Sequence, residues 1–212
     1  MKKKIALLLT FIIMTSSFVL PVYAKKIVFT DVPQDSWEAP YVYELVDRGV
    51  ISGYGDGTFG PENTVLRCEY AKMLVGITET PLSKSISTPY VDVPNWEWYV
   101  KYVNSSLDYM TGFTVDGQLY FRPEDEATRE IVTVALVKAM KMDVTKYTDA
   151  TGFLSEYFSD LNTISEYNRP YIAAAVESGY VTGDIGGTFR GQDPIIRAEI
   201  AAVLCRAFPD KK

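Results

Sequence analysis

Three copies of one sequence pattern run through the chain, and this repeat constrains the fold more than any single residue does. In each copy an aspartate precedes a loop phenylalanine by 28, 29 and 29 residues, and an arginine follows that phenylalanine after eight more. Repeats of this length are typical of supersecondary units that bury their apolar faces against one another. The copies open with Phe29-Thr30-Asp31-Val32, Tyr90-Val91-Asp92-Val93 and Phe158-Ser159-Asp160-Leu161.

Each copy predicts a helix, a glycine-rich loop and a second helix. In the first copy, Ser36 is placed to cap a helix, Gly49 is placed to end it, and the loop over residues 53–59 follows. Glycine adopts positive φ without strain, so we expect tight turns in this loop. A calcium site is the alternative, but it needs several alternating carboxylates, and the loop contains Asp56 alone. The second copy is less regular: Trp96 and Trp98 are both candidates to match Trp37, and nothing matches Gly49 cleanly.

The second helix of each copy carries the clearest pattern. The positions three, four and seven residues after the arginine form an amphipathic stripe with one buried face, and the small residue at position four lets helices approach closely. We therefore predict a mainly α fold, in which three helix–loop–helix repeats pack as a pseudo-threefold, three-lobed helical bundle with the arginines at the rims of its seams. The stripe residues are Tyr70, Ala71, Leu74, Val132, Thr133, Leu136, Ile200, Ala201 and Leu204.

Residues 1–24 form a predicted secretory signal peptide, with three lysines before a long apolar run and small residues before position 25. An uncleaved membrane anchor is the alternative, although the apolar run is short for a span. Removing these three lysines and no acids changes the formal charge from −6 to −9. Such a charge argues against nucleic acid as a partner, because binding it needs a basic face. We expect a secreted protein without a membrane partner after cleavage.

The composition also limits the chemistry. The chain has no histidine, which removes the commonest general base and the commonest transition-metal ligand. Cys68 and Cys205 fall in the predicted second helices of the first and third copies. A disulfide is one alternative for an exported protein, but two isolated cysteines more often pack as small apolar residues. We expect no metal and no cofactor.

An arginine at a helix start suits the binding of acids. Its guanidinium matches a carboxylate bidentately, and the helix terminus adds unpaired N–H groups and partial positive charge. The alternatives are that the arginines pair with neighbouring acids such as Glu69 and Glu199, or that they serve a structural purpose copied with the repeat. The opening aspartates are expected to cap or brace the first helix. Aromatic residues near the loops offer flat surfaces to sugar rings: Trp37, Tyr54, Trp96, Trp98 and Phe113.

These motifs resemble the S-layer homology domain family, and the resemblance covers essentially the whole chain after the signal segment. It is carried by Phe29–Val32 with Trp37, by the loop Gly53–Pro61, and by a helix-start signature that reads Thr-Arg-Ala-Glu in the family. Ile131 stands where the second copy should have the glutamate. The signatures are Leu66-Arg67-Cys68-Glu69, Thr128-Arg129-Glu130-Ile131 and Ile196-Arg197-Ala198-Glu199.

The resemblance implies three modules, over residues 25–86, 87–153 and 154–212, and a three-lobed helical pseudo-trimer that anchors exported proteins non-covalently to the bacterial cell wall. The implied ligand is an acidic secondary cell-wall polysaccharide, often pyruvylated, bound in grooves between modules with the signature arginine on its acidic group. The candidate glycan-binding residues are Arg67, Arg129, Arg197, Asp31, Asp92, Asp160, Trp37, Trp96, Tyr54, Phe113, Glu69 and Glu199.

Two other functions remain alternatives. The same grooves, or an outer face, are suited to binding another surface protein without direct glycan contact. A wall-active hydrolase would need paired carboxylates facing a cleft, and no pair in this sequence stands out from ordinary surface acids. We therefore expect a non-enzymatic binding protein at the cell surface.

Overall fold

A computed structural model describes residues 27–210 of the chain, so the predicted signal peptide lies outside the described residues. The described part is mainly helical, with one small two-stranded sheet. No helix within it is both long and apolar enough to cross a membrane. In chain order the elements are α1 (Ala39–Asp47), α2 (Arg67–Ile77), α3 (Val100–Ser105), β1 (Phe113–Val115), β2 (Gln118–Tyr120), α4 (Arg129–Ala139), α5 (Ala150–Ser155), the short 3₁₀ turns Leu161–Thr163 and Glu166–Asn168, α6 (Arg169–Glu177) and α7 (Arg197–Ala207).

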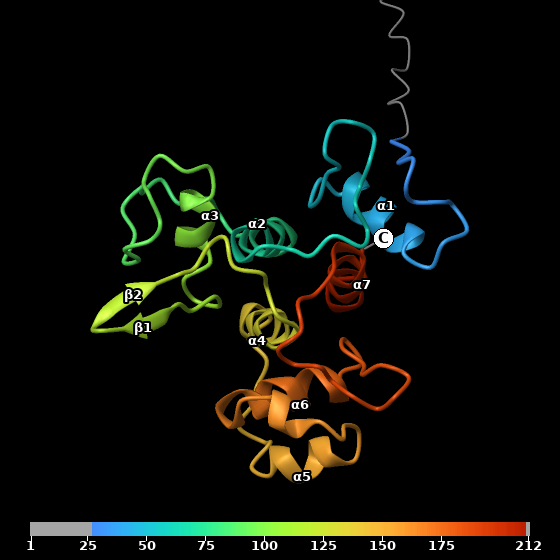
Figure 1. Ribbon diagram of the computed structural model, residues 1–212, viewed down its shortest axis with the longest axis vertical. Helices are drawn as coiled ribbons and strands as arrows, with labels where there is room; N and C mark the ends of the chain where they lie inside the picture. The colour runs from blue at the N-terminus through green and yellow to red at the C-terminus, as the bar shows by residue number, and fades with distance from the viewer. Residues whose placement is uncertain (1–26, 211–212) are drawn as a thin grey trace, which may run out of the picture.

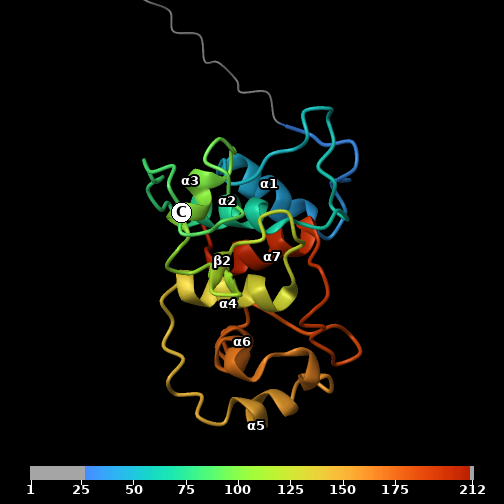
Figure 2. The same ribbon diagram turned by 60° about the vertical axis from the view of Figure 1, so that its left-hand side comes forward.

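The helices α2, α4 and α7 lie together at the middle of the molecule, and the other elements lie further out (Figure 1). Each of the three begins at the arginine of its copy, as predicted. The outer partners of α2 and α4 come from the following copy, with α3 packed on α2 and α6 on α4, whereas α7 of the last copy packs on α1 of the first. After a turn of the view, α5 and α6 still lie together at one end, beside α4 (Figure 2). The first and last helices of the chain therefore share one packed unit.

A closed ring of backbone hydrogen bonds joins the segments that lead into the central helices. The amide of Val65 donates to the carbonyl of Ile195 at 3.2 Å, Ile195 donates to Ala127 at 3.0 Å, and Ala127 donates back to Val65 at 2.7 Å. These three residues are buried, so the bonds are shielded from water. The ring fixes how the three helix starts lie relative to one another.

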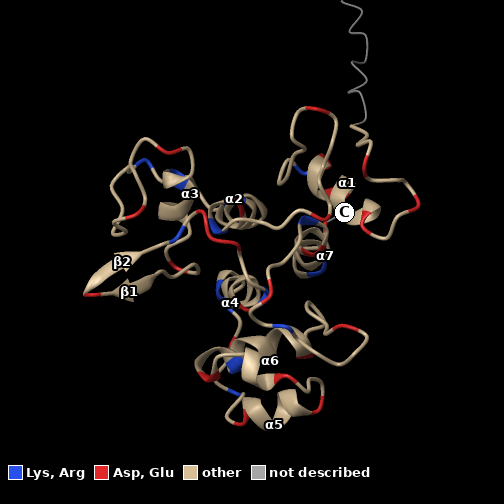
Figure 3. Cartoon of the chain, viewed as in Figure 1, with Lys and Arg blue, Asp and Glu red and all other residues tan. Residues whose placement is uncertain are grey.

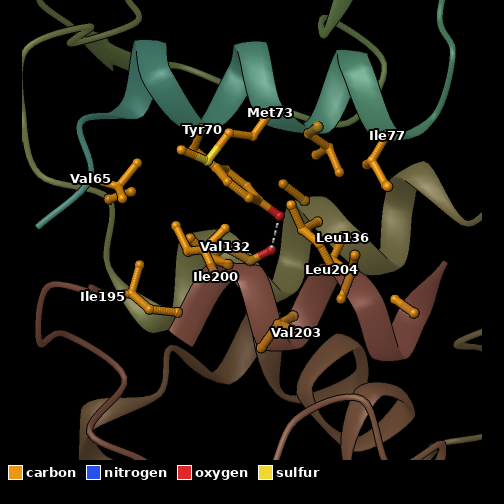
Figure 4. Close-up of a cluster of buried hydrophobic side chains, with 14 of the residues drawn as sticks. Val65, Tyr70, Met73, Ile77, Val132, Leu136, Ile195, Ile200, Val203 and Leu204 are labelled. Carbon is orange, nitrogen blue, oxygen red and sulfur yellow. Dashed lines mark hydrogen bonds between the residues drawn. The ribbon is translucent and has the colours of Figure 1, made fainter. Parts of the chain in front are cut away.

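The predicted stripe forms the core between the central helices. All nine of its residues are buried, and Figure 4 shows several of them pointing toward one another from the three helices. Tyr70 is fully buried, and its Oη donates to the carbonyl oxygen of Val132 at 2.9 Å. This bond gives the one polar atom of the Tyr70 side chain a partner inside the core, as buried hydroxyls require.

Several local expectations were wrong or incomplete. Ser36 does not cap α1, whose N-cap is Glu38 without a side-chain cap bond, whereas Gly49 does follow the end of that helix, with a φ of 69°. The loop of the second copy is a β-hairpin, in which Asp116 and Gly117 have the two consecutive positive φ values that two-residue hairpin turns favour. The helix α5, before the third copy's opening motif, was not expected from the sequence.

The glycine that begins each loop is needed for space. A Cβ on Gly53 would lie 2.4 Å from the Phe29 ring and 2.4 Å from the carbonyl oxygen of Thr58. Equivalent clashes arise at Gly112 with Tyr90 and at Gly183 with Phe158. The aromatic residue that opens each copy therefore packs directly onto the first glycine of its loop.

Candidate functional site

The three signature arginines make the same hydrogen bonds to the loop of the next copy. Their Nε atoms donate to the carbonyl oxygen of the loop phenylalanine, from Arg67 to Phe121, from Arg129 to Phe189 and from Arg197 to Phe59, at 2.8–2.9 Å. Their Nη2 atoms donate to a second loop carbonyl at 2.9–3.1 Å, on Thr111, Thr182 and Ser52 respectively. The side chains are almost fully buried, with 2%, 8% and 6% of the residue exposed. These contacts give the arginines a structural role.

The helix starts are also covered by these loops. The amide of Arg67 donates to Asp125 O, that of Arg129 to Asp193 O, and that of Arg197 to Asn63 O. The next amide of each helix donates to a carbonyl of the same loop. The first two N–H groups of each helix are therefore already satisfied by the loop and are not free to bind an anion.

The opening aspartates brace the loops and do not cap the first helices. Asp31 accepts from the amides of Phe59 and Gly60 at 2.8 and 2.7 Å, one to each carboxylate oxygen. Asp92 and Asp160 do the same in the other copies. Burial alone would raise the pKa of Asp160, but the hydrogen bonds from these amides and from the Thr163 hydroxyl together outweigh it and lower that pKa. Both oxygens of each aspartate are thus used within the fold.

Each arginine lines one cavity, of about 190 to 230 Å³, together with an exposed aromatic side chain from another copy. We call them the Arg67, Arg129 and Arg197 cavities. Tyr167, Trp37 and Trp98 are their respective aromatic residues, with 78%, 55% and 52% exposed. Each cavity also includes the loop bound by its arginine and one face of a central helix.

Most of the predicted ligand residues meet in these cavities. Phe113 lines the Arg67 cavity, Glu199 lines the Arg129 cavity, and Tyr54 and Glu69 line the Arg197 cavity. Trp96 and the aspartates Asp31, Asp92 and Asp160 line none of the three. Trp98, six residues after Asp92, corresponds to Trp37, six residues after Asp31; Trp96 is 80% exposed.

The sequence reasoning missed the basic side chain on the helix face of each cavity. Lys72 lies in the Arg197 cavity with its Nζ 5.7 Å from the centre of the Trp98 ring. Lys138 and Arg206 occupy the position nine residues after the signature arginine, in the Arg67 and Arg129 cavities. This shared offset from the arginine is the sequence signal that could have identified Lys138 and Arg206. Figure 3 shows basic residues beside α2, α4 and α7, with acidic residues spread over the loops.

The buried guanidinium groups also stack on aromatic rings. The Cζ of Arg197 lies 4.5 Å from the centre of the Phe59 ring and 4.9 Å from that of Tyr54. Burial lowers the pKa of Arg67 to about 10 and also lowers that of Arg129, where Glu199 opposes the shift. A pKa of about 10 leaves Arg67 charged at neutral pH, so the Arg67 cavity keeps a fixed positive group.

Comparison with known proteins identifies related sequences. Residues 28–71 and 157–201 match the model of the S-layer homology domain, and the stretch between them is not matched. Over 206 residues, 94% of this chain, the S-layer protein of Bacillus licheniformis is 30% identical, and the S-layer protein EA1 of Bacillus anthracis is 29% identical over 199 residues, also 94% of this chain. The exoglucanase XynX of Acetivibrio thermocellus is 26% identical over 183 residues, or 86% of the chain. The chain spans only 22%, 22% and 16% of these proteins.

Proposed function

Because the chain belongs to the S-layer homology domain family, we propose that it anchors to the bacterial cell wall by binding an acidic secondary cell-wall polysaccharide. The named relatives include both S-layer proteins and an exoglucanase, which share only this part of their length with the chain. A region shared by proteins of such different kinds fits an attachment role better than a catalytic one.

The proposed architecture is an approximate threefold arrangement of modules over residues 25–86, 87–153 and 154–212. The closed ring of hydrogen bonds through Val65, Ala127 and Ile195 supports it, because equivalent residues of the three copies act as donor and acceptor in turn. The middle module is included because its arginine, aspartate and loop make the same bonds as those of the other two.

One observation carries the binding proposal: the same arginine-to-loop geometry occurs three times, each time beside a cavity with an exposed aromatic ring. An exposed aromatic face is suited to the apolar face of a sugar ring. A guanidinium and a second basic side chain at the same cavity are suited to a carboxylate such as a pyruvate ketal. Three such cavities on one chain allow one long polymer to be held at several points, which raises its overall affinity.

The aromatic residues give a cleaner test than the arginines, because they are exposed and their removal leaves the core intact. We expect the triple variant Trp37→Ala, Trp98→Ala and Tyr167→Ala to bind wall sacculi at least tenfold more weakly, equivalent to about 1.4 kcal/mol. The matched control is Trp96→Ala, which removes an exposed tryptophan outside the three cavities and should bind like the wild type.

Sacculi from which the polysaccharide has been removed complete the experiment. The proposal expects them to lose binding of the wild-type protein. Retention on the stripped sacculi would contradict it and would favour the alternative, in which this protein docks onto another surface protein.

A further inference from the structure

The three cavities differ in how their positive charge is balanced. The signature glutamate, two residues after the arginine, is present in α2 as Glu69 and in α7 as Glu199, but α4 has Ile131 at this position. In each cavity this position belongs to the central helix that faces the arginine of the preceding copy. Because Ile131 replaces the glutamate, the guanidinium of Arg67 faces no carboxylate at this position.

In the Arg129 cavity the guanidinium is already paired. Nη1 of Arg129 donates to Oε1 of Glu199 at 3.0 Å, while Nε and Nη2 donate to loop carbonyls. The neighbouring Arg190 also has acidic partners, with its Nε 3.4 Å from Asp184 and its Nη2 4.0 Å from Glu199. The remaining basic group, Arg206, is exposed, where solvent and salt weaken its attraction for an anion.

Among the described residues Arg67 makes no such ion pair, and the acids that act on it, Asp125 and Asp92, lie outside the lining of its cavity. Of the residues that line it within the described part of the chain, Arg67 and Lys138 are basic and none is acidic. Ile131 is half-buried in its wall, at the position where Glu199 pairs with Arg129 in the other cavity. No partner of Arg67 Nη1 is found among residues 27–210, so this nitrogen is left for a ligand.

A buried carboxylate behind this cavity holds its rim without entering it. Glu130, 4% exposed, accepts bonds from the amide of Ser165 at 3.0 Å, from Nε2 of Gln192 at 2.8 Å and from Nδ2 of Asn168. Asn168 and its neighbour Tyr167 both line the Arg67 cavity. Since both oxygens of Glu130 are occupied by neutral donors, it fixes the position of the rim and leaves the two cations of the cavity unpaired.

We infer that the Arg67 cavity is the charge-selective site, which takes the carboxylate of an acidic sugar, while the Arg129 cavity, where Glu199 pairs with Arg129, takes an uncharged sugar unit. The inference rests on the proposed function and specifies it. The Arg197 cavity is intermediate, because Glu69 lines it and makes no ion pair within 4 Å with Arg197 or Lys72 in the described structure.

A carboxylate swap tests this assignment. Ile131→Glu places in the Arg67 cavity the glutamate that α2 and α7 carry at the same helix position, so we expect the variant to fold. Its affinity for a pyruvate-ketal sugar should fall at least tenfold, measured by calorimetric titration. Ile131→Gln, the matched neutral control, should remain within twofold of the wild type, and the unmodified parent sugar should bind equally to all three proteins. Thermal unfolding of each variant checks the fold.

The reverse change tests the Arg129 cavity. Glu199→Gln keeps the length of the side chain and removes its charge, which frees Arg129 for an external carboxylate. The indole NMR signal of Trp37, which lines this cavity, should then shift on addition of the pyruvate-ketal sugar, and it should not shift in the wild type.

The outcomes separate this inference from the proposed function. If Ile131→Glu binds the ketal as tightly as Ile131→Gln, or if Trp37 of the wild type already responds to it, the assignment is overturned while wall anchoring stands. If the wild type does not prefer the ketal to its parent sugar, acid recognition is wrong at every cavity. If the protein also stays on sacculi stripped of polysaccharide, the proposed function fails together with this inference.

Discussion

Arg197, the first residue of the last helix, donates a hydrogen bond from Nε to the carbonyl oxygen of Phe59 at 2.9 Å, across 138 residues of sequence. Nη2 of the same side chain donates to Ser52 O at 2.9 Å. These two bonds connect the third copy to the loop of the first, so the last and first copies of the chain are in direct contact. Because Arg197 also lines a cavity, its replacement combines a loss of stability with any loss of binding.

We expect Arg197→Ala to destabilise the fold. The change leaves the buried carbonyl oxygen of Phe59 without its donor, at about 1–3 kcal/mol, and also removes the bond to the carbonyl of Ser52, an exposed residue that water can reach. Urea denaturation measures the loss. The control is Arg206→Ala, at the exposed end of the same helix, which should change the unfolding free energy by less than about 0.5 kcal/mol. Equal stability of the two variants would show that the guanidinium contacts contribute little.

The sequence predicted the parts of the fold that depend on local pattern. The spacing from each loop phenylalanine located the start of α2, α4 and α7, and the apolar stripe identified their buried faces. Both signals are local, because helical periodicity and helix starts are determined by residues within about ten positions of one another. Gly49 likewise ended α1 as its position indicated.

The repeat pattern did not predict which residues of different copies contact one another. The repeat located Arg67 at a helix start, but not the carbonyls of Phe121 and Thr111 that occupy its Nε and Nη2. Tyr167 was missed because it follows Asp160 by seven residues, whereas the equivalent tryptophans follow their aspartates by six. Pairing between segments far apart in sequence depends on the packing of the whole chain, so the candidate site was predicted by residue type and only partly by partner.

Replacement of Tyr70 by phenylalanine should remove one buried hydrogen bond without leaving a cavity. The Tyr70 hydroxyl donates to the carbonyl oxygen of Val132, between two central helices. We expect Tyr70→Phe to lower the unfolding free energy by about 1 kcal/mol. Tyr167→Phe, at a 78% exposed position, is the control and should leave the stability unchanged. A stable Tyr70→Phe variant would mean that the bond adds nothing to the core.

The two cysteines should be unreactive in the folded protein. Cys68 and Cys205 are free and buried, and burial raises the pKa of each thiol to about 12. Since the thiolate is the reactive form, almost none is present at neutral pH. Titration with a thiol reagent should find two slowly reacting groups in the native protein and two fast ones in denaturant. An absence of thiols after denaturation would instead indicate that the two are joined by a disulfide.

The decrease in the free energy of unfolding at acid pH should depend on Asp160. Its pKa is lowered in the fold, where burial opposes the shift and the hydrogen bonds from the amides of Phe189 and Arg190 and the Thr163 hydroxyl together more than compensate. A carboxyl with a lowered folded-state pKa contributes full stability above its unfolded value of about 3.9, and this contribution is lost as the pH falls through the folded pKa. Urea denaturation between pH 6 and about pH 2 should therefore give a shallower acid decline for Asp160→Asn, together with lower stability near neutrality. Asp116→Asn, at the exposed hairpin turn, should keep the wild-type profile; identical curves for the two variants would contradict the bracing role of Asp160.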